Sequence, residues 1–179
     1  YYDFETKTTT YYNNAEIFDP KTGKWTETEQ MKYSRGFGHS AALLEDGKVL
    51  VSGGYNDKGK YLSKCELYLP ELNTWIQTDT LITPRVWHSQ IITDNGDILL
   101  IGGKSYDNIT GSTISENSCL LFNKQNYNWE IKNELEDYRT SADIFNIGDN
   151  KFIIVGGDYQ NTWAIYDADD YNIVYSEVF

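Results

Sequence analysis

A pattern that recurs about every 50 residues constrains this chain more than any other feature, because such a period indicates an array of similar structural units. Each unit contains an aromatic residue, a tryptophan seven residues later, an arginine ten residues after the tryptophan, and two adjacent glycines 17 or 18 residues after the arginine. In chain order, these positions are Phe18, Trp25, Arg35 and Gly53-Gly54; Tyr68, Trp75, Arg85 and Gly102-Gly103; and Phe122, Trp129, Arg139 and Gly156-Gly157. A fourth unit carries Ile173 at the tryptophan position, which marks it as a degenerate repeat.

The residues between these positions predict four short β-strands in each unit. In the second unit, the expected strands are 39–44, 48–52, 64–69 and 74–78. Strands 98–101 and 152–155 are apolar throughout, so we expect both of their faces to be covered. The 15 tyrosines, seven phenylalanines and five tryptophans favour an all-β protein, because aromatic residues are enriched in strands. Four-stranded sheets that stack radially as the blades of a β-propeller cover their faces in this way.

The joint spacing of aromatic residue, tryptophan, arginine and diglycine resembles the kelch-repeat family from Asn14 to about Phe179. The resemblance implies an all-β propeller of four-stranded antiparallel kelch blades, of which about three and a half are present. Residues 45–54 are also similar to bacterial-type kelch units related to the central domain of galactose oxidase.

The repeat positions divide the chain into predicted blades. We expect residues 1–13 to be an N-terminal arm or strand remnant, 14–37 a partial blade, 38–79 and 88–132 two blades, and 141–179 a degenerate or terminal blade. All would belong to one propeller domain or segment. Known propellers close with four to eight blades, so we expect a segment of a larger ring or a half-ring completed by a partner. The apolar faces of the terminal blades would then contact remaining blades or a second copy.

The net charge of −12 argues against nucleic acid or an anionic membrane surface as a partner, since phosphate groups would repel the chain. No apolar run approaches the length of a membrane span, so no membrane insertion is expected. Cys65 and Cys119 occupy equivalent positions and are interpreted as small buried residues. The compartment stays open, with an extracellular or cell-surface location favoured over the cytoplasm.

Loop lengths indicate where a ligand would bind. The distance from diglycine to the next aromatic residue varies from 15 to 20 to 10 residues, whereas the other spacings stay fixed. These variable loops are expected to share one face with the segments between blades, which makes that face the predicted binding surface. The candidate binding residues are Phe37, Trp87, Tyr138, Tyr55, Asn56, Asp57, Tyr106, Asp107, Asn108, Asp158, Tyr159, Arg35, Arg85 and Arg139. The alternative is that the aromatic residues pack between blades and that the recurring arginines bind carbonyl or carboxylate groups as part of the scaffold.

Aromatic planes beside amides and carboxylates suit sugar rings or extended peptides. We therefore predict a non-catalytic binding or interaction module with a protein or glycan ligand. The alternative is a secreted carbohydrate-active enzyme, of the galactose oxidase or sialic-acid-processing type, with catalytic groups partly on missing blades. No catalytic residue, metal site or cofactor is predicted, because His39 and His88 begin equivalent strands without further ligands in view.

Overall fold

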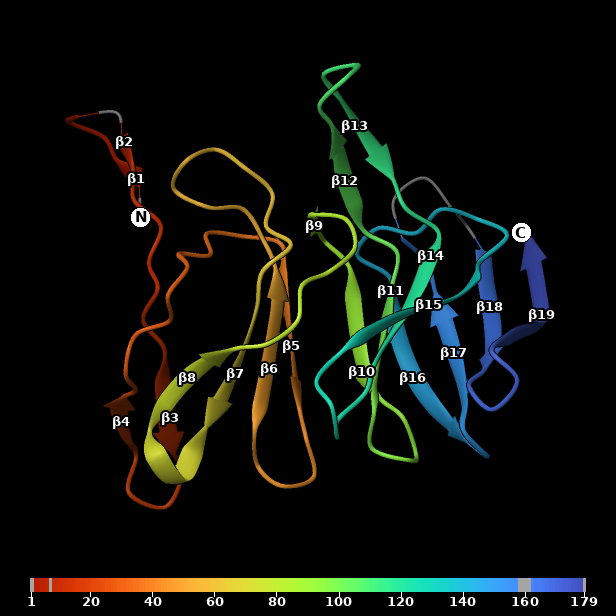
Figure 1. The fold of residues 1–179 in the computed structure, drawn as a ribbon, viewed down its shortest axis with the longest axis horizontal. Coiled ribbons are helices and arrows are strands. Elements are labelled where there is room, and N and C mark those ends of the chain that lie inside the picture. The colour runs from red at the N-terminus through yellow and green to blue at the C-terminus, as the bar shows by residue number, and fades with distance from the viewer. Residues whose placement is uncertain (1, 7, 158–161, 179) are drawn as a thin grey trace.

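The computed structural model describes residues 2–6, 8–157 and 162–178, and nearly all of its regular structure is antiparallel β-sheet (Figure 1). Three four-stranded sheets follow one another along the chain. The first contains β5 (His39–Leu43), β6 (Val49–Gly53), β7 (Cys65–Leu69) and β8 (Thr74–Gln77). The second contains β10 (Ser89–Ile92), β11 (Ile98–Ile101), β14 (Ser118–Phe122) and β15 (Trp129–Glu134). The third contains β16 (Asp143–Gly148), β17 (Lys151–Val155), β18 (Thr162–Asp167) and β19 (Asn172–Val178).

Shorter elements lie before and between these sheets. Two-stranded sheets are formed by β1 (Tyr2–Asp3) with β2 (Thr8–Thr9), and by β3 (Glu16–Asp19) with β4 (Lys24–Glu27). A 3₁₀ turn, η1 (Pro70–Leu72), joins β7 to β8, in the interval between the expected strands 64–69 and 74–78. None of the described helical segments has the length and hydropathy of a membrane span.

The four-stranded sheets pack face to face in chain order, with β10 between β5 and β16. Strand β11 joins the two cores: Ile98 and Leu100 pack toward the first sheet, whereas Leu99 and Ile101 pack toward the third. All four side chains are buried, which confirms the expectation for this strand. On β17 the same expectation is wrong, because Val155 is 40% exposed on the side where no further sheet of the described chain packs.

The diglycines allow neighbouring sheets to approach. Gly102 has φ +63°, and a Cβ atom there would overlap the backbone carbonyl oxygen of Arg139 from the next unit. The following glycine, Gly103, donates its N–H to that same carbonyl at 2.7 Å. Gly54 bonds the carbonyl of Arg85 in the same way, at 2.9 Å. A side chain at the first glycine would therefore separate the sheets.

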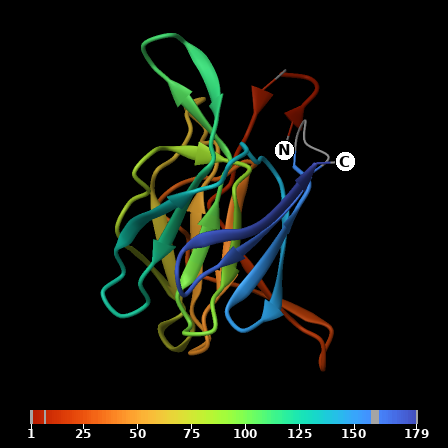
Figure 2. The same cartoon turned by 90° about the vertical axis from the view of Figure 1, so that its right-hand side faces the viewer.

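One part of the chain differs from its predicted form. Residues 104–116, which follow the second diglycine and belong to the longest of the expected variable loops, contain a hairpin of β12 (Lys104–Asp107) and β13 (Ser112–Ser115). Strand β12 also pairs with β9 (Arg85–Val86), so that a small three-stranded sheet forms. Figures 1 and 2 show this hairpin projecting from the same end of the molecule as β1 and β2, opposite the turns that join β5 to β6 and β10 to β11. We call this end the loop rim; it contains residues 36–38, 54–62, 84–88 and 103–116.

Candidate functional site

Aromatic side chains from separate segments stack on one another at the loop rim. The ring of Phe37 lies between Tyr55 and Trp87, with centroid distances of 4.8 Å and 5.6 Å and near-parallel planes. Tyr11, from the segment before β3, meets Phe37 and Tyr55 edge-on at 6.1 Å and 5.9 Å. Offset-stacked and edge-on geometries are the favoured arrangements of aromatic pairs, so the four rings support each other.

Two further tyrosines extend this stack toward the projecting hairpin. Tyr61 contacts Tyr55 at 5.8 Å and Tyr106 at 6.2 Å, and the backbones of Tyr55 and Tyr61 form an isolated β-bridge. We call the six connected rings the aromatic rim; they are Tyr11, Phe37, Tyr55, Tyr61, Trp87 and Tyr106. Phe37, Trp87 and Tyr106 are 38%, 37% and 47% exposed, so the aromatic rim is open to solvent.

Trp87 has an unusual backbone conformation. Its φ of +55° is left-handed, which costs a residue with a side chain about 1–2 kcal/mol. Two hydrogen bonds hold the position: the Trp87 N–H donates to the Gly38 carbonyl at 2.7 Å, and the Ser141 N–H donates to the Trp87 carbonyl at 2.8 Å. Gly38 and Ser141 also have positive φ, so the three residues are structural equivalents in successive units. A bulky residue kept in such a conformation suggests a functional constraint.

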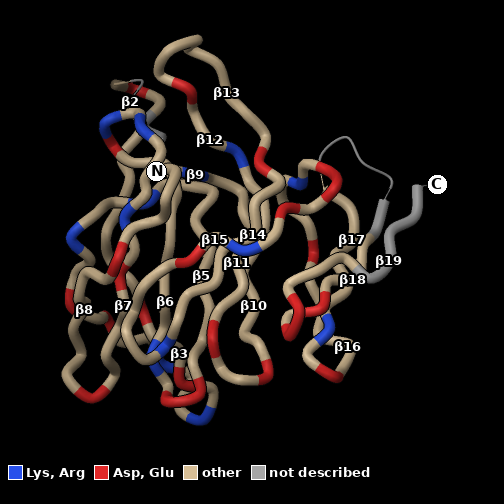
Figure 3. Tube along the Cα trace, turned by 45° about the vertical axis from the view of Figure 1, so that its right-hand side comes forward, with Lys and Arg blue, Asp and Glu red and all other residues tan. Residues whose placement is uncertain are grey.

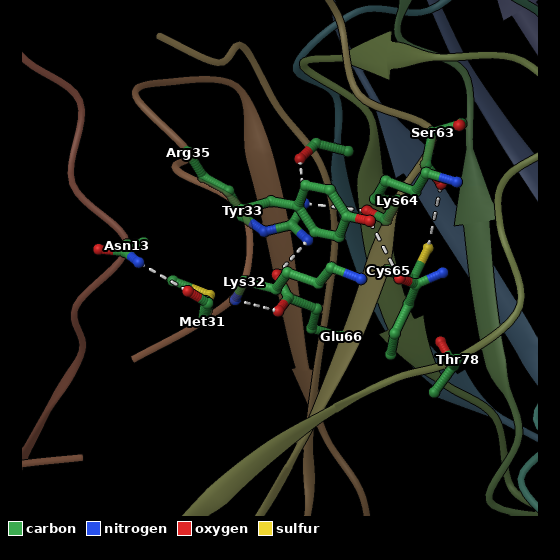
Figure 4. Close-up of polar contacts among 12 residues, drawn as sticks. Asn13, Met31, Lys32, Tyr33, Arg35, Ser63, Lys64, Cys65, Glu66 and Thr78 are labelled. Carbon is green, nitrogen blue, oxygen red and sulfur yellow. Dashed lines mark hydrogen bonds and ion pairs between the residues drawn. The ribbon is translucent and has the colours of Figure 1, made fainter. Parts of the chain in front are cut away.

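The three recurring arginines point inward rather than toward solvent. Each donates from Nη1 to the carbonyl of the first glycine of its unit's diglycine: Arg35 to Gly53 at 2.5 Å, Arg85 to Gly102 at 3.0 Å, and Arg139 to Gly156 at 2.9 Å. Figure 4 shows Arg35 beside Lys64 and Glu66, which accept further hydrogen bonds from it. This geometry matches the scaffold role that the recurrence indicates, and ligand contact by these arginines stays a prediction.

A cleft opens between the 55–61 loop and the β12–β13 hairpin. Its volume is about 550 Å³. The lining residues are Tyr55, Gly59, Lys60, Tyr61, Pro84, Tyr106, Asn108 and Thr113. Tyr106 and Thr113 face each other across the hairpin register, so the hairpin contributes one wall and the loop contributes the other. The cleft adjoins the aromatic rim and is large enough for several side chains of an extended ligand.

The remaining predicted residues have local roles or lie elsewhere. The Asn56 side chain accepts the N–H groups of Lys58 and Lys60, both at 3.0 Å, and so shapes its loop. Asp57 accepts the Ser34 hydroxyl at 3.0 Å.

On the hairpin, the Asp107 carboxylate accepts the Thr110 hydroxyl at 2.7 Å and the Ile109 N–H at 2.8 Å. These bonds, with the hydroxyl contributing most, lower the pKa of Asp107. Tyr138 is exposed and lies outside the aromatic rim. Asp158 and Tyr159 lie outside the described residues.

The two histidines lie beneath the rim. His88 is buried, with Nε2 2.7 Å from the Ser52 hydroxyl oxygen. Burial, and secondarily the charge of Arg85, lower the pKa of His88 to about 3; burial also lowers the pKa of His39. Ser52 is completely buried, so this serine–histidine pair offers no nucleophile to a substrate. Within the described residues, no group of three or more histidine, cysteine or acidic side chains is placed to hold a metal ion.

Exposed apolar side chains also occur on the two end sheets. They are Ile17, Phe18 and Trp25 at one end, and Phe145, Ile147 and Val155 at the other. These are the faces expected to contact further blades or a second copy, and that expectation stays a prediction.

The sequence patterns did not identify Tyr11, Tyr61 or Pro84 as part of the site. These residues stand at positions that do not recur in every unit. A signal for the hairpin was present, however, because the turn residues Asp107, Asn108 and Gly111 separate two short polar–apolar alternations.

The sequence and the fold of this chain are similar to those of known repeat proteins. The kelch motif matches residues 39–80, which cover the first four-stranded sheet. Kelch-like protein 41b of Danio rerio is 30% identical over 161 residues, or 90% of this chain and 24% of that protein. Alpha-scruin of Limulus polyphemus is 30% identical over 83 residues, or 46% of this chain and 9% of that protein. The chain thus spans only about a quarter or less of these relatives.

A solved structure with the same fold has a more distant sequence. The structure of YjhT aligns with a TM-score of 0.71 and 15% identity, covering 93% of this chain and 66% of that one. At this identity the likeness concerns the arrangement of the sheets alone.

Proposed function

Since this chain is a run of kelch-repeat β-propeller blades, we propose that it is a protein-interaction module whose binding surface is the loop rim. Kelch-repeat proteins are generally protein-interaction modules. The observation that carries the proposal for this chain is the exposed aromatic rim beside a cleft of about 550 Å³.

Physical chemistry favours a protein ligand at such a surface. Tyrosine and tryptophan dominate the binding energy of protein interfaces, because their large rings lose little conformational entropy when they become fixed. Here the rings hold one another in place before any ligand arrives, which lowers the entropic cost of binding. The groups that line the cleft are tyrosines, a proline, an amide, a hydroxyl and a lysine, which suit recognition rather than bond cleavage.

A glycan is the second candidate ligand, since exposed ring faces such as that of Tyr106 can stack on sugars and Asn108 can bond their hydroxyls. Nothing in the described residues supports the alternative that the protein is a carbohydrate-active enzyme. The inward-facing arginines and the buried Ser52–His88 pair instead stabilise the scaffold.

The test compares binding of the wild type and two variants to a protein array and a glycan array. The rim variant carries Tyr61→Ser and Tyr106→Ser; the control carries Leu72→Ser, an exposed apolar residue on η1 at the opposite end. We expect protein partners that bind the wild type and the control, and at least about tenfold weaker binding by the rim variant. Equal binding by all three proteins, or binding to glycans alone, would contradict the proposal.

A further inference from the structure

A second hollow, of about 580 Å³, adjoins the cleft and shares Lys60 and Tyr61 with it. Four lysines line this hollow: Lys32, Lys58, Lys60 and Lys64. The lining includes one carboxylate, that of Asp57, which accepts a hydrogen bond from Ser34. Positive charge therefore exceeds negative charge at this part of the loop rim, although the whole chain carries a net charge of −12.

The lysines around the hollow, like Lys21 and Lys24 at the opposite end, form no salt bridge within the described residues, in contrast to four other lysines of the chain. Elsewhere, Lys48, Lys124, Lys132 and Lys151 each form a salt bridge with an aspartate or glutamate. Among the described residues, no carboxylate forms a salt bridge with any of the four lysines around the hollow.

The nearby Glu66 carboxylate already binds other groups of the chain and does not pair with these lysines. It accepts the Arg35 guanidinium at 2.9 Å and the backbone N–H of Lys32 at 2.6 Å, beneath the surface. Figure 3 shows blue segments together with some red ones at the upper end of the molecule, and several red acidic turns with a few blue segments at the lower end. Within the described lining, Asp57 supplies one negative charge against four lysines, so most of the positive charge of the hollow is not balanced there.

We propose that the hollow and the cleft together bind one extended acidic peptide segment of a partner protein. Its aspartate or glutamate side chains pair with the lysines, and its apolar or aromatic side chains enter the cleft between Tyr61 and Tyr106. This inference rests on the proposed interaction function and names the chemistry of the partner. A short peptide fits better than a nucleic acid, because the lysines act over about 8–10 Å in salt, whereas a long polyanion also meets the acidic remainder of the chain.

The experiment selects binders from a random 16-residue peptide library with the chain immobilised through its C-terminus. Its matched variants change net charge equally. Lys58→Gln with Lys60→Gln alters the hollow, and Lys21→Gln with Lys24→Gln removes two exposed lysines at the opposite end.

Selected peptides should be enriched about twofold or more in aspartate and glutamate. Their affinity should fall at least about tenfold in the Lys58/Lys60 variant and as salt rises from 0.05 to 0.5 M, because charge pairing is screened. The Lys21/Lys24 variant should bind as the wild type does.

Selection of no peptides, of peptides without acidic enrichment, or of peptides that bind both lysine variants equally overturns the inference. If that happens while the Tyr61/Tyr106 variant still loses an array partner, the interaction function stands and only the acidic chemistry fails. If the array test fails too, both proposals are overturned.

Discussion

Arg35 and Glu66 form an ion pair inside the first four-stranded sheet, with Arg35 Nη2 2.9 Å from Glu66 Oε2 and both side chains about 1% exposed. Arg35 reaches Glu66 from the segment before β5, while its other nitrogen bonds the carbonyls of Gly53 and Lys64. In the second sheet the position of Glu66 is taken by Leu120, and Arg85 instead bonds the hydroxyls of Thr83 and Ser118. In the second unit Arg85 Nη2 lies 4.0 Å from Glu116 Oε2, a longer ionic contact with a glutamate at a different position, whereas the arginine-to-glycine bond recurs in all three units.

Glu66→Gln should lower the free energy of unfolding by about 3 kcal/mol, because it leaves the Arg35 charge buried without a counter-ion. Urea denaturation would measure the change. Glu130→Gln, which breaks an exposed pair with Lys132, serves as the control and should have no measurable effect. Similar midpoints for the two variants would show that the buried charge is compensated in another way.

Gly102→Ala should destabilise the protein by about 3 kcal/mol or more, because the new Cβ overlaps the Arg139 carbonyl and the sheets must separate. Gly23 has a similar φ, +69°, but no atom within 4 Å of the added Cβ. Gly23→Ala should therefore cost only the backbone strain, about 1 kcal/mol. Thermal unfolding of both variants separates crowding from conformational strain, and equal losses would refute the crowding explanation.

Because Trp87 has a left-handed backbone conformation, glycine should be more stabilising than alanine at this position, the reverse of the usual order in a strand. Trp87→Gly should be more stable than Trp87→Ala by about 1 kcal/mol, since glycine adopts positive φ without strain. At Trp25, on β4, alanine should instead be more stable than glycine by about 0.5–1 kcal/mol. Chemical denaturation of the four variants provides the measurement; alanine being preferred at both sites would exclude a left-handed Trp87.

Stability should depend on pH through His88. Its pKa is about 3 in the folded protein, below the unfolded value of about 6.5, so protonation favours the unfolded chain. The stabilisation is therefore complete above pH 6.5 and is lost as the pH falls toward 3, at about 1.4 kcal/mol per pH unit.

The informative window is pH 6 to 5, above the range in which most carboxylates titrate. There, His88→Gln should reduce the dependence of the unfolding free energy on pH to the part that His39 contributes, since burial lowers the pKa of His39 as well. If the variant keeps the wild-type slope of unfolding free energy against pH, another titrating group causes the dependence.

The fold class could be predicted from the sequence because the repeat signal is local and recurs along the chain, whereas the blade boundaries stay a prediction. Diglycine, tryptophan and arginine fix the ends of the strands, and the all-β kelch-propeller fold is confirmed. The outer face of β17 was predicted wrongly, because strand composition shows that a face can be buried and not that a neighbour is present to bury it.

The site could be predicted only in part. Phe37, Tyr55, Trp87 and Tyr106 lie together at the loop rim, where variable loops and segments between blades meet, and their role in binding stays a prediction. Their stacking depends on Tyr61, which does not occupy a repeat position. Counted from Arg35 and Arg85, Phe37 corresponds to Trp87, whereas the backbone hydrogen bonds make Gly38 the equivalent of Trp87, because one extra residue lies between Arg35 and Gly53.

The hydrogen bonds that link Gly38 to Trp87 and Trp87 to Ser141 use backbone atoms alone. No side chain is needed to make these links, so the loops around them can change in sequence and length while neighbouring sheets remain joined. The β12–β13 hairpin lies beside these links, since Lys104 on β12 pairs with Val86, the residue before Trp87. A hairpin of different sequence could replace it, as binding loops are replaced on an antibody framework. The same sheets would then carry a different binding surface.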